Sequence, residues 1–400
     1  MINVILIERT TIIMKYRLQA CLFVFIAFML GCNEYIIVGV LPDISSEFGT
    51  GLSQLGLLVT IFALVYALST PLVTSFGNRF LRHRVLLALI LIFFIGNTWT
   101  ALATNFTSLL LSRILTASVA GAIISIVLVM ANYIAPRHKR ASLVSWVFAG
   151  FSLASIIGIP LGTLISTTFS WHDSFWLISA ITFIVLCLLF GLIPKDTPQF
   201  KGTLKHQFAL LKEKQVLLGV TFVVAVCAAD YTIYTYIRPL FTNEMHFNNT
   251  WLNWLLFGMG IFFIIGNKFG GYLADNGGLK PLRYVYITMT LLMLLLGAAI
   301  KLPWLGAATI ALLCVCFASY GASTQLMFLE IAEKKYPQSL DLASSLNSIF
   351  ANLGISLGSL TAAQTVEFTS LANVGYIGAL YGFLATGLTF ILYRDLLREN

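Results

Sequence analysis

The heptapeptide GIPLGTL at residues 158–164 returns as GISLGSL at residues 354–360, which is 196 positions further along the chain. The same offset places Glu34 on Asp230, and it places the basic turn at 75–84 on the turn at 271–280. One offset of almost half the chain length that joins several separate segments indicates an internal duplication. The sequence therefore predicts two homologous halves.

Composition indicates that both halves lie in a membrane. Of 400 residues, 58% are hydrophobic and only 10% are charged, and the mean hydropathy is +0.90. A soluble fold does not have this balance, so a soluble enzyme, a nucleic-acid-binding module and a disulfide scaffold are excluded. A membrane helix needs about 20 mostly apolar residues. Twelve such runs are predicted, at 18–41, 52–76, 84–103, 107–133, 141–165, 173–193, 215–241, 250–274, 281–300, 303–331, 341–366 and 373–393.

These runs predict an all-α membrane protein whose twelve transmembrane helices form two parallel six-helix repeats. The repeats run in the same direction because six is even, and a substrate site is expected between them near the bilayer midplane. The expected domains are a tail at 1–17, a six-helix bundle at 18–193, a linker at 194–214, a second bundle at 215–393 and a tail at 394–400.

The basic residues predict the orientation. Of 24 Lys and Arg residues, 21 lie in or beside every second connection, and cytoplasmic loops collect these residues. We therefore expect both termini and the linker on the cytoplasmic side of a bacterial cell membrane. Arg113, Arg238 and Lys301 are the three exceptions.

The ends and the cysteines carry little chemistry. The first apolar run is too long for a cleaved signal peptide, so it is expected to remain as a span. Residues 1–13 are either a disordered tail or an upstream extension of a chain that starts at Met14. All six cysteines lie in apolar segments without CxxC spacing, so we interpret them as buried small hydrophobic residues and expect no metal.

Several motifs resemble a known family. The turn GGYLADNGGLK at 270–280 resembles a signature of the major facilitator superfamily. The stretches NEYIIVGVLPDIS at 33–45, RFLRHRVLLALILIFFIGN at 79–97, GFSLASIIGIPLGTLI at 150–165 and SLNSIFANLGISLG at 345–358 resemble its drug:proton antiporters of the arabinose efflux permease type. The resemblance covers about residues 20–395 and implies export. Arg79 stands where the pattern has Asp, and the Gln and Gly that usually follow the Arg113 position are absent.

Three ionisable residues lie inside the predicted spans, where each costs roughly 2.5–3.5 kcal/mol to insert. They are Glu34, Asp230 and Arg113. Desolvation increases the proton affinity of a carboxylate and a nearby cation decreases it, so such a group can load and unload a proton. We expect at least one of Glu34 and Asp230 to exchange a proton against substrate, with Arg113 modulating it. The alternatives are a helix cap or a permanent Glu34–Arg113 bridge, and an Arg113 side chain that snorkels to the outer interface.

Small residues on the fifth and eleventh spans predict close helix packing, and Pro160 predicts a bend. Close packing suits an interface between helices that rocks during transport and must stay sealed. The resemblance to the antiporters implies that this motif prevents leak. Ordinary packing of small residues is the alternative. The turn around Asp275 predicts a conformational latch, with a solvated loop as its alternative. The gating and conformational candidates are Gly150, Gly158, Pro160, Gly162, Arg79, Arg82, Arg84, Gly271, Asp275, Gly277, Lys280, Gly354 and Gly358.

Polar and aromatic residues within the spans are the candidates for the substrate cavity, and contacts between helices are the alternative for several of them. They are Asn33, Tyr35, Tyr231, Tyr234, Tyr236, Gln325, Asn347 and Asn352. Aromatic faces with hydrogen-bonding tips suit drugs or sugar- and nucleoside-like molecules.

The predicted function is a proton-coupled secondary transporter that exports small organic molecules by alternating access. A proton-coupled sugar importer or facilitator of the same fold is the alternative. An enzyme is not expected, because the sequence contains no HExxH, GxSxG or GxxxxGK motif. The expected partners are a small-molecule substrate, protons and the lipid bilayer, without cofactor, metal or nucleic acid. A monomer is expected because one chain contains the whole pathway.

Overall fold

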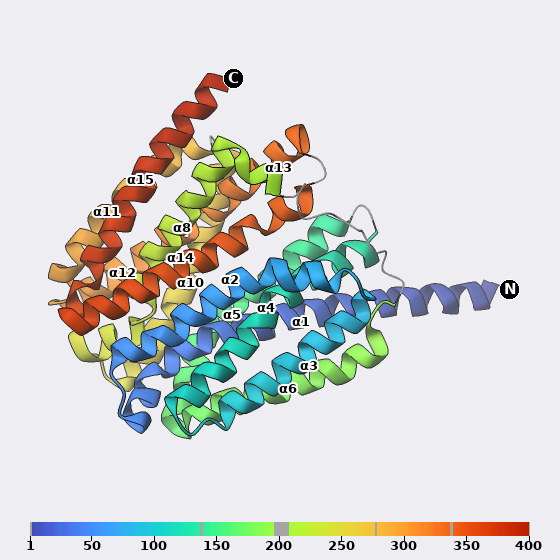
Figure 1. Ribbon diagram of the computed structural model, residues 1–400, viewed down its shortest axis with the longest axis horizontal. Helices are drawn as coiled ribbons and strands as arrows, with labels where there is room; N and C mark the ends of the chain where they lie inside the picture. Colours follow the sequence, from blue (N-terminus) through green and yellow to red (C-terminus); the bar gives the residue numbers. More distant parts are fainter. Residues whose placement is uncertain (1, 137–138, 196–207, 277, 337–338, 400) are drawn as a thin grey trace. The chain divides into compact units, whose positions relative to one another are not determined.

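The computed structural model describes residues 2–136, 139–195, 208–276, 278–336 and 339–399, and Figure 1 shows that these residues fold almost entirely into helices. Gly277 and most of the predicted linker at 194–214 lie outside the described residues. The longer helices are α1 (Ile2–Phe48), α2 (Leu52–Gly77), α3 (Arg82–Ala101), α4 (Phe106–Ile134), α5 (Arg140–Thr168), α6 (Trp171–Leu192), α8 (Lys214–Tyr234), α10 (Asn249–Asp275), α11 (Leu279–Ala299), α12 (Pro303–Ala318), α13 (Gly321–Lys335), α14 (Leu340–Phe368) and α15 (Val374–Glu399). The shorter elements are η2 (Phe208–Lys212), α9 (Ile237–Pro239), η3 (Leu240–Glu244) and η5 (Leu371–Asn373).

Twelve segments of the described chain are long and apolar enough to cross a membrane. This confirms the predicted all-α class and the predicted number of spans. Two spans differ from the single helices that the sequence predicted. The seventh ends its regular part at Tyr234 and continues as α9 and a π-helical turn, η3. The tenth breaks between Ala318 and Gly321 into α12 and α13.

The first span is longer than predicted. It continues past residue 41, with Pro42 inside the helix, to Phe48. Gly49 then has a φ of 62°, a left-handed conformation that glycine adopts without steric cost and that commonly ends helices. The added turns carry Asp43 and Glu47, so the end of α1 is charged.

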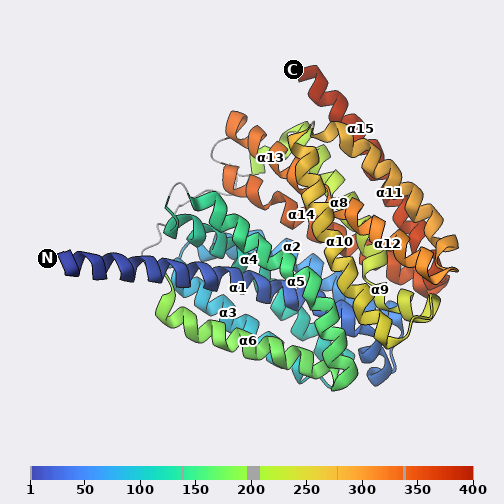
Figure 2. The same ribbon diagram turned by 180° about the vertical axis from the view of Figure 1, so that it is seen from behind.

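The chain divides into two compact units. Residues 1–36 and 69–201 form the first unit. In this unit, α3 packs against α4 and α6, and α5 also contacts α4 and α6. Figures 1 and 2 show α3 beside α6 from both sides. The predicted bundles at 18–193 and 215–393 remain a prediction.

Residues 37–68 and 202–400 form the second unit. Helix α8 is its centre, since it packs against α14 and α15 and also contacts α12 and α13. Outside this group, α11 packs on α15 and α10 packs on α12.

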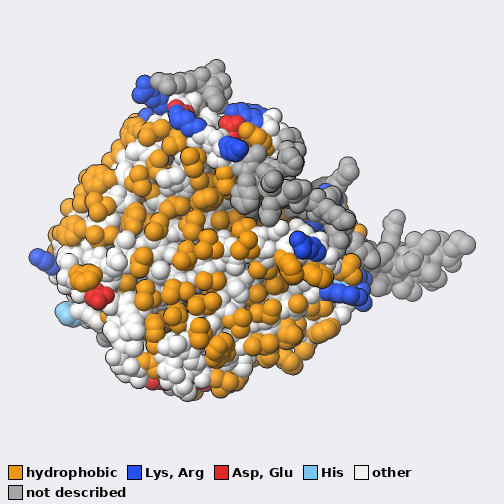
Figure 3. Space-filling model, in the orientation of Figure 1, with side chains coloured by type: hydrophobic (Ala, Val, Ile, Leu, Met, Phe, Trp, Pro, Cys, Tyr) orange, Lys and Arg blue, Asp and Glu red, His pale blue; other side chains and the backbone are white. Residues whose placement is uncertain are grey.

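Hydrophobic side chains cover much of the visible surface in Figure 3, and Lys and Arg side chains gather mostly in its upper and right-hand parts. Large apolar residues such as Leu72, Phe190, Trp254 and Phe383 are exposed. Such a surface is costly in water and favourable in lipid. The described helices therefore have the surface of a multi-pass membrane protein.

Candidate transport site

Arg113 of α4 is the centre of a polar cluster in the first unit. Its side chain is fully buried, and its Nη1 donates to the backbone oxygen of Asn33 at 3.2 Å and to Asn33 Oδ1 at 3.1 Å. The guanidinium also lies 5.8 Å from the ring centroid of Phe175 on α6, within cation–π range. Arg113 therefore turns inward to α1 instead of snorkelling to an interface.

The cluster extends to α3 through Asn97. Asn33 Nδ2 donates to Asn97 Oδ1, and Asn97 Nδ2 donates to the backbone oxygen of Phe93 at 2.8 Å. Thr100 Oγ1 and Ser112 Oγ lie 2.8 Å apart beside it. Sequence reasoning named Asn33 and Arg113 but missed Asn97 and Phe175, because their spacing in the sequence carries no signal of this contact.

Glu34 lies next to this cluster and is only partly buried. It forms no hydrogen bond and no ion pair within 4.0 Å to any described residue, although Arg113 is close enough to act on it through Coulomb attraction. The guanidinium is hydrogen-bonded to Asn33 instead. The structure thus shows a carboxylate and a cation that interact electrostatically without an ion pair within 4.0 Å.

Asp230 of α8 has different surroundings in the second unit. Its Oδ1 atom is buried and finds no hydrogen-bond partner among the described residues. The groups on which its charge acts are the Cys314 thiol of α12 and the Tyr320 hydroxyl at the break before α13. A buried charge without a partner is costly, so an ionised Asp230 is unfavourable in these surroundings.

The substrate-cavity candidates separate by burial. Asn33, Tyr231, Tyr234, Tyr236 and Asn352 are buried, whereas Tyr35, Gln325 and Asn347 remain partly exposed. Tyr231 and Tyr234 pack together with 5.6 Å between ring centroids, and Tyr35 packs edge-on against Phe151 at 6.0 Å. The partly exposed members keep some accessible side-chain surface.

Gln325 and Asn347 also join two helices. Asn347 Nδ2 donates to Gln325 Oε1 at 3.1 Å and to the Gly321 oxygen at 3.2 Å, and Gln325 Nε2 donates to the Ala343 oxygen at 3.2 Å. Asn352 Nδ2 donates to the Ser348 oxygen within α14. These amides hold α13 against α14, the contact role that the sequence left open as the alternative.

The predicted glycines of the fifth and eleventh spans occur at close helix contacts. A Cβ atom on Gly158 would lie 2.9 Å from Tyr35 Cβ, and one on Gly162 would lie 3.1 Å from the Ile36 oxygen. In the second unit, a Cβ on Gly358 would lie 2.2 Å from the Ala228 oxygen. Gly150 and Gly354 meet Val24 and Val224 in the same way. The repeated glycines thus bring α5 onto α1 and α14 onto α8.

We expect Gly358→Ala to destabilise the protein by about 1–3 kcal/mol, because the new methyl group meets a backbone oxygen that cannot move alone. The matched control is Gly387→Ala on α15, where nothing lies within 4 Å of an added Cβ. There the better helix propensity of alanine should be neutral or stabilising, by up to about 1 kcal/mol. Thermal unfolding in detergent measures both. A Tm for Gly358→Ala equal to or above that of Gly387→Ala would contradict the close-packing interpretation.

The predicted gating turns lie at helix ends. Arg79 and Arg84 are exposed, and the Arg79 guanidinium lies 5.7 Å from the Phe76 ring centroid; Arg82 is partly buried. In the second half, Asp275 is exposed at the end of α10 and has no ion pair with a described residue. The positive φ of this turn, 55°, belongs to Gly278, which the sequence interpretation did not single out; Gly277 lies outside the described residues. Gly271 has open space around it, and the backbone oxygen of Lys280 accepts a hydrogen bond from Arg283 Nε at 3.1 Å.

A polar network ties the start of α8 to the end of α13 in the second unit. Glu213 accepts hydrogen bonds from Lys335 Nζ at 3.2 Å and from the Tyr336 hydroxyl at 3.0 Å. The hydrogen bond to the Glu213 carboxylate raises the pKa of Tyr336. This network fixes the entry of the chain into the seventh span.

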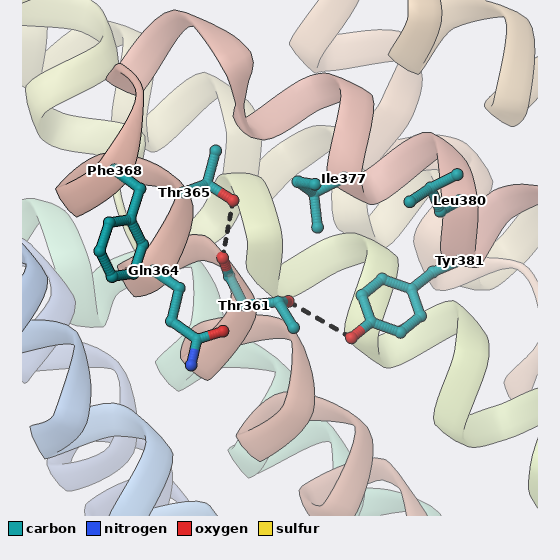
Figure 4. Close-up of a pocket in the computed structure, with 7 residues that line it drawn as sticks. All are labelled: Thr361, Gln364, Thr365, Phe368, Ile377, Leu380 and Tyr381. Carbon is teal, nitrogen blue, oxygen red and sulfur yellow. Dashed lines mark hydrogen bonds between the residues drawn. The ribbon is translucent and has the colours of Figure 1, made fainter.

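Two grooves open on α14 in the second unit. The first, of about 480 Å³, lies between α14 and α15 and is lined by Thr361, Gln364, Thr365, Phe368, Ile377, Leu380 and Tyr381. Figure 4 shows the Tyr381 hydroxyl directed at Thr361, to which it donates at 3.3 Å. The second, of about 400 Å³, lies between α2 and α14 and includes Gln54 and Glu367. None of the predicted cavity residues lines either groove.

Comparisons with known proteins agree with this architecture. Residues 23–359 match the family described as the Major Facilitator Superfamily. The chain is 31% identical to the "Inner membrane transport protein YdhP" of Escherichia coli K12, over 92% of this chain and 94% of that protein. It is 30% identical to the "Uncharacterized MFS-type transporter YtbD" of Bacillus subtilis, over 88% and 90%. It is 29% identical to a "Probable sugar efflux transporter" of Helicobacter pylori, over 90% and 91%.

Two solved structures share the fold. A bacterial homologue of the human lysosomal transporter Spinster superposes with a TM-score of 0.80 at 14% identity, covering 96% of this chain and 98% of that one. A D-xylose-proton symporter superposes with a TM-score of 0.78 at 16% identity, covering 94% and 96%.

The fold and the intramembrane charges define a multi-pass membrane transporter. The chain belongs to the Major Facilitator Superfamily, as its motifs indicated. A transporter of this fold binds small-molecule substrates within a lipid bilayer, so the chain is a carrier and not an enzyme.

Proposed function

We propose that this transporter is a proton-coupled exporter of small organic molecules that works by alternating access. The supporting observation is Glu34, a partly exposed carboxylate inside a span, beside a buried arginine with which it forms no ion pair within 4.0 Å. Such a carboxylate can be charged while it faces Arg113 and neutral after it binds a proton. A proton from outside then takes the place of the charge interaction, and its later release to the cytoplasm couples the transport cycle to the proton gradient.

Asp230 occupies the equivalent position in the second repeat and lacks a basic partner among the described residues. We propose that Glu34 and Asp230 are the proton-binding groups, that at least one of them exchanges its proton during transport, and that Arg113 modulates Glu34. The substrate is bound by the partly exposed polar and aromatic residues Tyr35, Gln325 and Asn347.

The substrate class is drugs or sugar- and nucleoside-like metabolites. Hydroxyl and amide tips beside aromatic faces suit such molecules, and the relative from Helicobacter pylori is named a probable sugar efflux transporter. A proton-coupled sugar importer or facilitator is the alternative. The direction of transport under an imposed pH gradient separates the two.

The proton gradient supplies enough energy for this task. One elementary charge that crosses 100 mV is worth about 2.3 kcal/mol, and a tenfold concentration ratio corresponds to about 1.4 kcal/mol. One proton per substrate therefore sustains more than tenfold export without a cofactor. We propose a monomer in the bacterial inner membrane, with both termini and the basic connections on the cytoplasmic side.

We expect substrate-induced proton movement in proteoliposomes that contain a lumenal pH dye. The probes are cationic drugs, neutral drugs of the chloramphenicol type, nucleosides and pentoses. One class should change the lumenal pH, and the Glu34→Gln/Asp230→Asn double variant should lose the change. Substrate flux without any pH change in the wild-type protein would instead identify a uniporter and reduce both carboxylates to structural residues.

A further inference from the structure

Arg238 is a buried cation of the seventh span that the proposed proton chemistry does not use. Its side chain is only 7% exposed. Nη1 lies 2.5 Å from Asp43 Oδ2 and 2.6 Å from the Gly39 oxygen, and Nη2 lies 3.0 Å from Asp43 Oδ1. This two-pronged arginine–carboxylate geometry is the strongest form of ion pair in proteins. It joins the end of α1 to the start of α9 within the second unit.

The backbone at both partners is irregular. Pro42 precedes Asp43 inside α1, and Pro239 follows Arg238 at the end of α9. Proline removes a helical hydrogen bond, and the π-helical turn η3 begins directly after Pro239. Breaks of this kind mark the places where a helix bends or rearranges. The pair therefore holds together two helix ends with an irregular backbone.

A second contact lies beside the pair. The Tyr236 hydroxyl donates to the Leu52 oxygen at the start of α2, at 3.0 Å. A Cβ atom on Gly56 would lie 2.3 Å from the Tyr236 hydroxyl oxygen and 3.0 Å from Ala363 Cβ on α14. The ends of the first, second, seventh and eleventh spans thus meet around Arg238 and Tyr236. Tyr236, a predicted cavity residue, contributes to this contact.

We propose that the Arg238–Asp43 pair is a latch that closes the outer ends of these spans and opens once in every transport cycle. This proposal rests on the proposed alternating access and orientation, because the pair lies at the ends opposite the basic connections. Asp43 is 27% exposed, so water already reaches one side of the pair. When the latch opens, hydration replaces the ion pair, which keeps the opening reversible.

The experiment measures how fast an impermeant maleimide labels a cysteine behind the latch. Ser359→Cys on α14 is the reporter, since Ser359 is fully buried and its Oγ lies 2.9 Å from Thr235 Oγ1. In right-side-out vesicles without substrate, Asp43→Asn and Arg238→Gln should each raise the labelling rate at least tenfold. A tenfold rise corresponds to a loss of about 1.4 kcal/mol in the free energy that favours the closed latch. Arg238→Lys, which keeps the charge but loses the second prong, should give a smaller rise.

Lys301→Gln is the matched control, because Lys301 is an exposed basic residue without an ion pair among the described residues. It should leave the labelling rate unchanged, and the protein without Ser359→Cys gives the background from native cysteines. Equal rates in the wild-type background and in both charge-removing variants, with a monodisperse detergent profile, would overturn the latch. A rise confined to inside-out vesicles would overturn its outer location. The assay needs neither substrate nor proton gradient, so its failure is distinct from the absence of substrate-induced proton movement.

Discussion

Replacing Glu34 by glutamine should abolish export driven by a pH gradient while leaving exchange of substrate for substrate intact. Glutamine has the size of a protonated glutamate but cannot release a proton, so the variant is held in one protonation state. Exchange needs only the substrate-bound steps of the cycle, whereas net export needs the carboxyl group to load and unload. We expect accumulation against the gradient to fall at least tenfold in proteoliposomes, with exchange within twofold of wild type.

The control is Glu330→Gln, the same substitution at an exposed position of α13. It should change neither assay. Full gradient-driven accumulation by Glu34→Gln would remove Glu34 as a coupling residue and leave Asp230 alone in that role. Loss of exchange as well as accumulation would place Glu34 in substrate binding.

Hydropathy alone was sufficient to predict the twelve spans, because each must cover the bilayer with apolar residues. Hydropathy did not predict where the helices of the seventh and tenth spans are interrupted. The tenth span reads as one apolar run, yet the helix breaks at Ser319 and Tyr320, where the Ser319 hydroxyl bonds back to the Cys316 oxygen. The seventh span contains Pro239 and was still predicted as continuous. An apolar run reports how hydrophobic a segment is. A local break in the backbone helix does not change that hydrophobicity, so the run looks continuous.

The repeat located the intramembrane carboxylates but not their surroundings. Glu34 and Asp230 align at one offset, which predicts equivalent positions on the first and seventh spans. Their neighbours come from other spans. Glu34 in the first unit lies near Arg113 of α4. Asp230 in the second unit lies near the Cys314 thiol of α12 and the Tyr320 hydroxyl between α12 and α13. The pairing of Arg238 with Asp43 also joins residues almost half the chain apart. Such tertiary partners leave no periodic signal in a single sequence.

Arg113→Ala is the second substitution with a large expected effect. It removes the donor to both oxygens of Asn33 and leaves Glu34 without its compensating charge. Loss of one member of a buried charge cluster typically costs about 3–5 kcal/mol. We expect a Tm lowered by several degrees and transport at or near background. Arg113→Lys, which keeps the charge but loses the planar fork, should fold and retain partial activity. Thermal unfolding and substrate exchange on the same preparations measure the two effects.

An Arg113 with a purely structural role would give the same loss of stability. A double-mutant cycle with Glu34 therefore decides whether the two charges interact. If the two charges interact, the Glu34→Gln/Arg113→Gln double variant should be more stable than Arg113→Gln alone, since it leaves no uncompensated carboxylate. Their coupling should lie in the range of about 0.5–3 kcal/mol that neighbouring residues show. The same cycle with Glu330→Gln in place of Glu34→Gln should give additive changes. Additivity between Glu34 and Arg113 would mean that the arginine serves Asn33 and the packing of α4 on α1, and that the proton on Glu34 is controlled by another group.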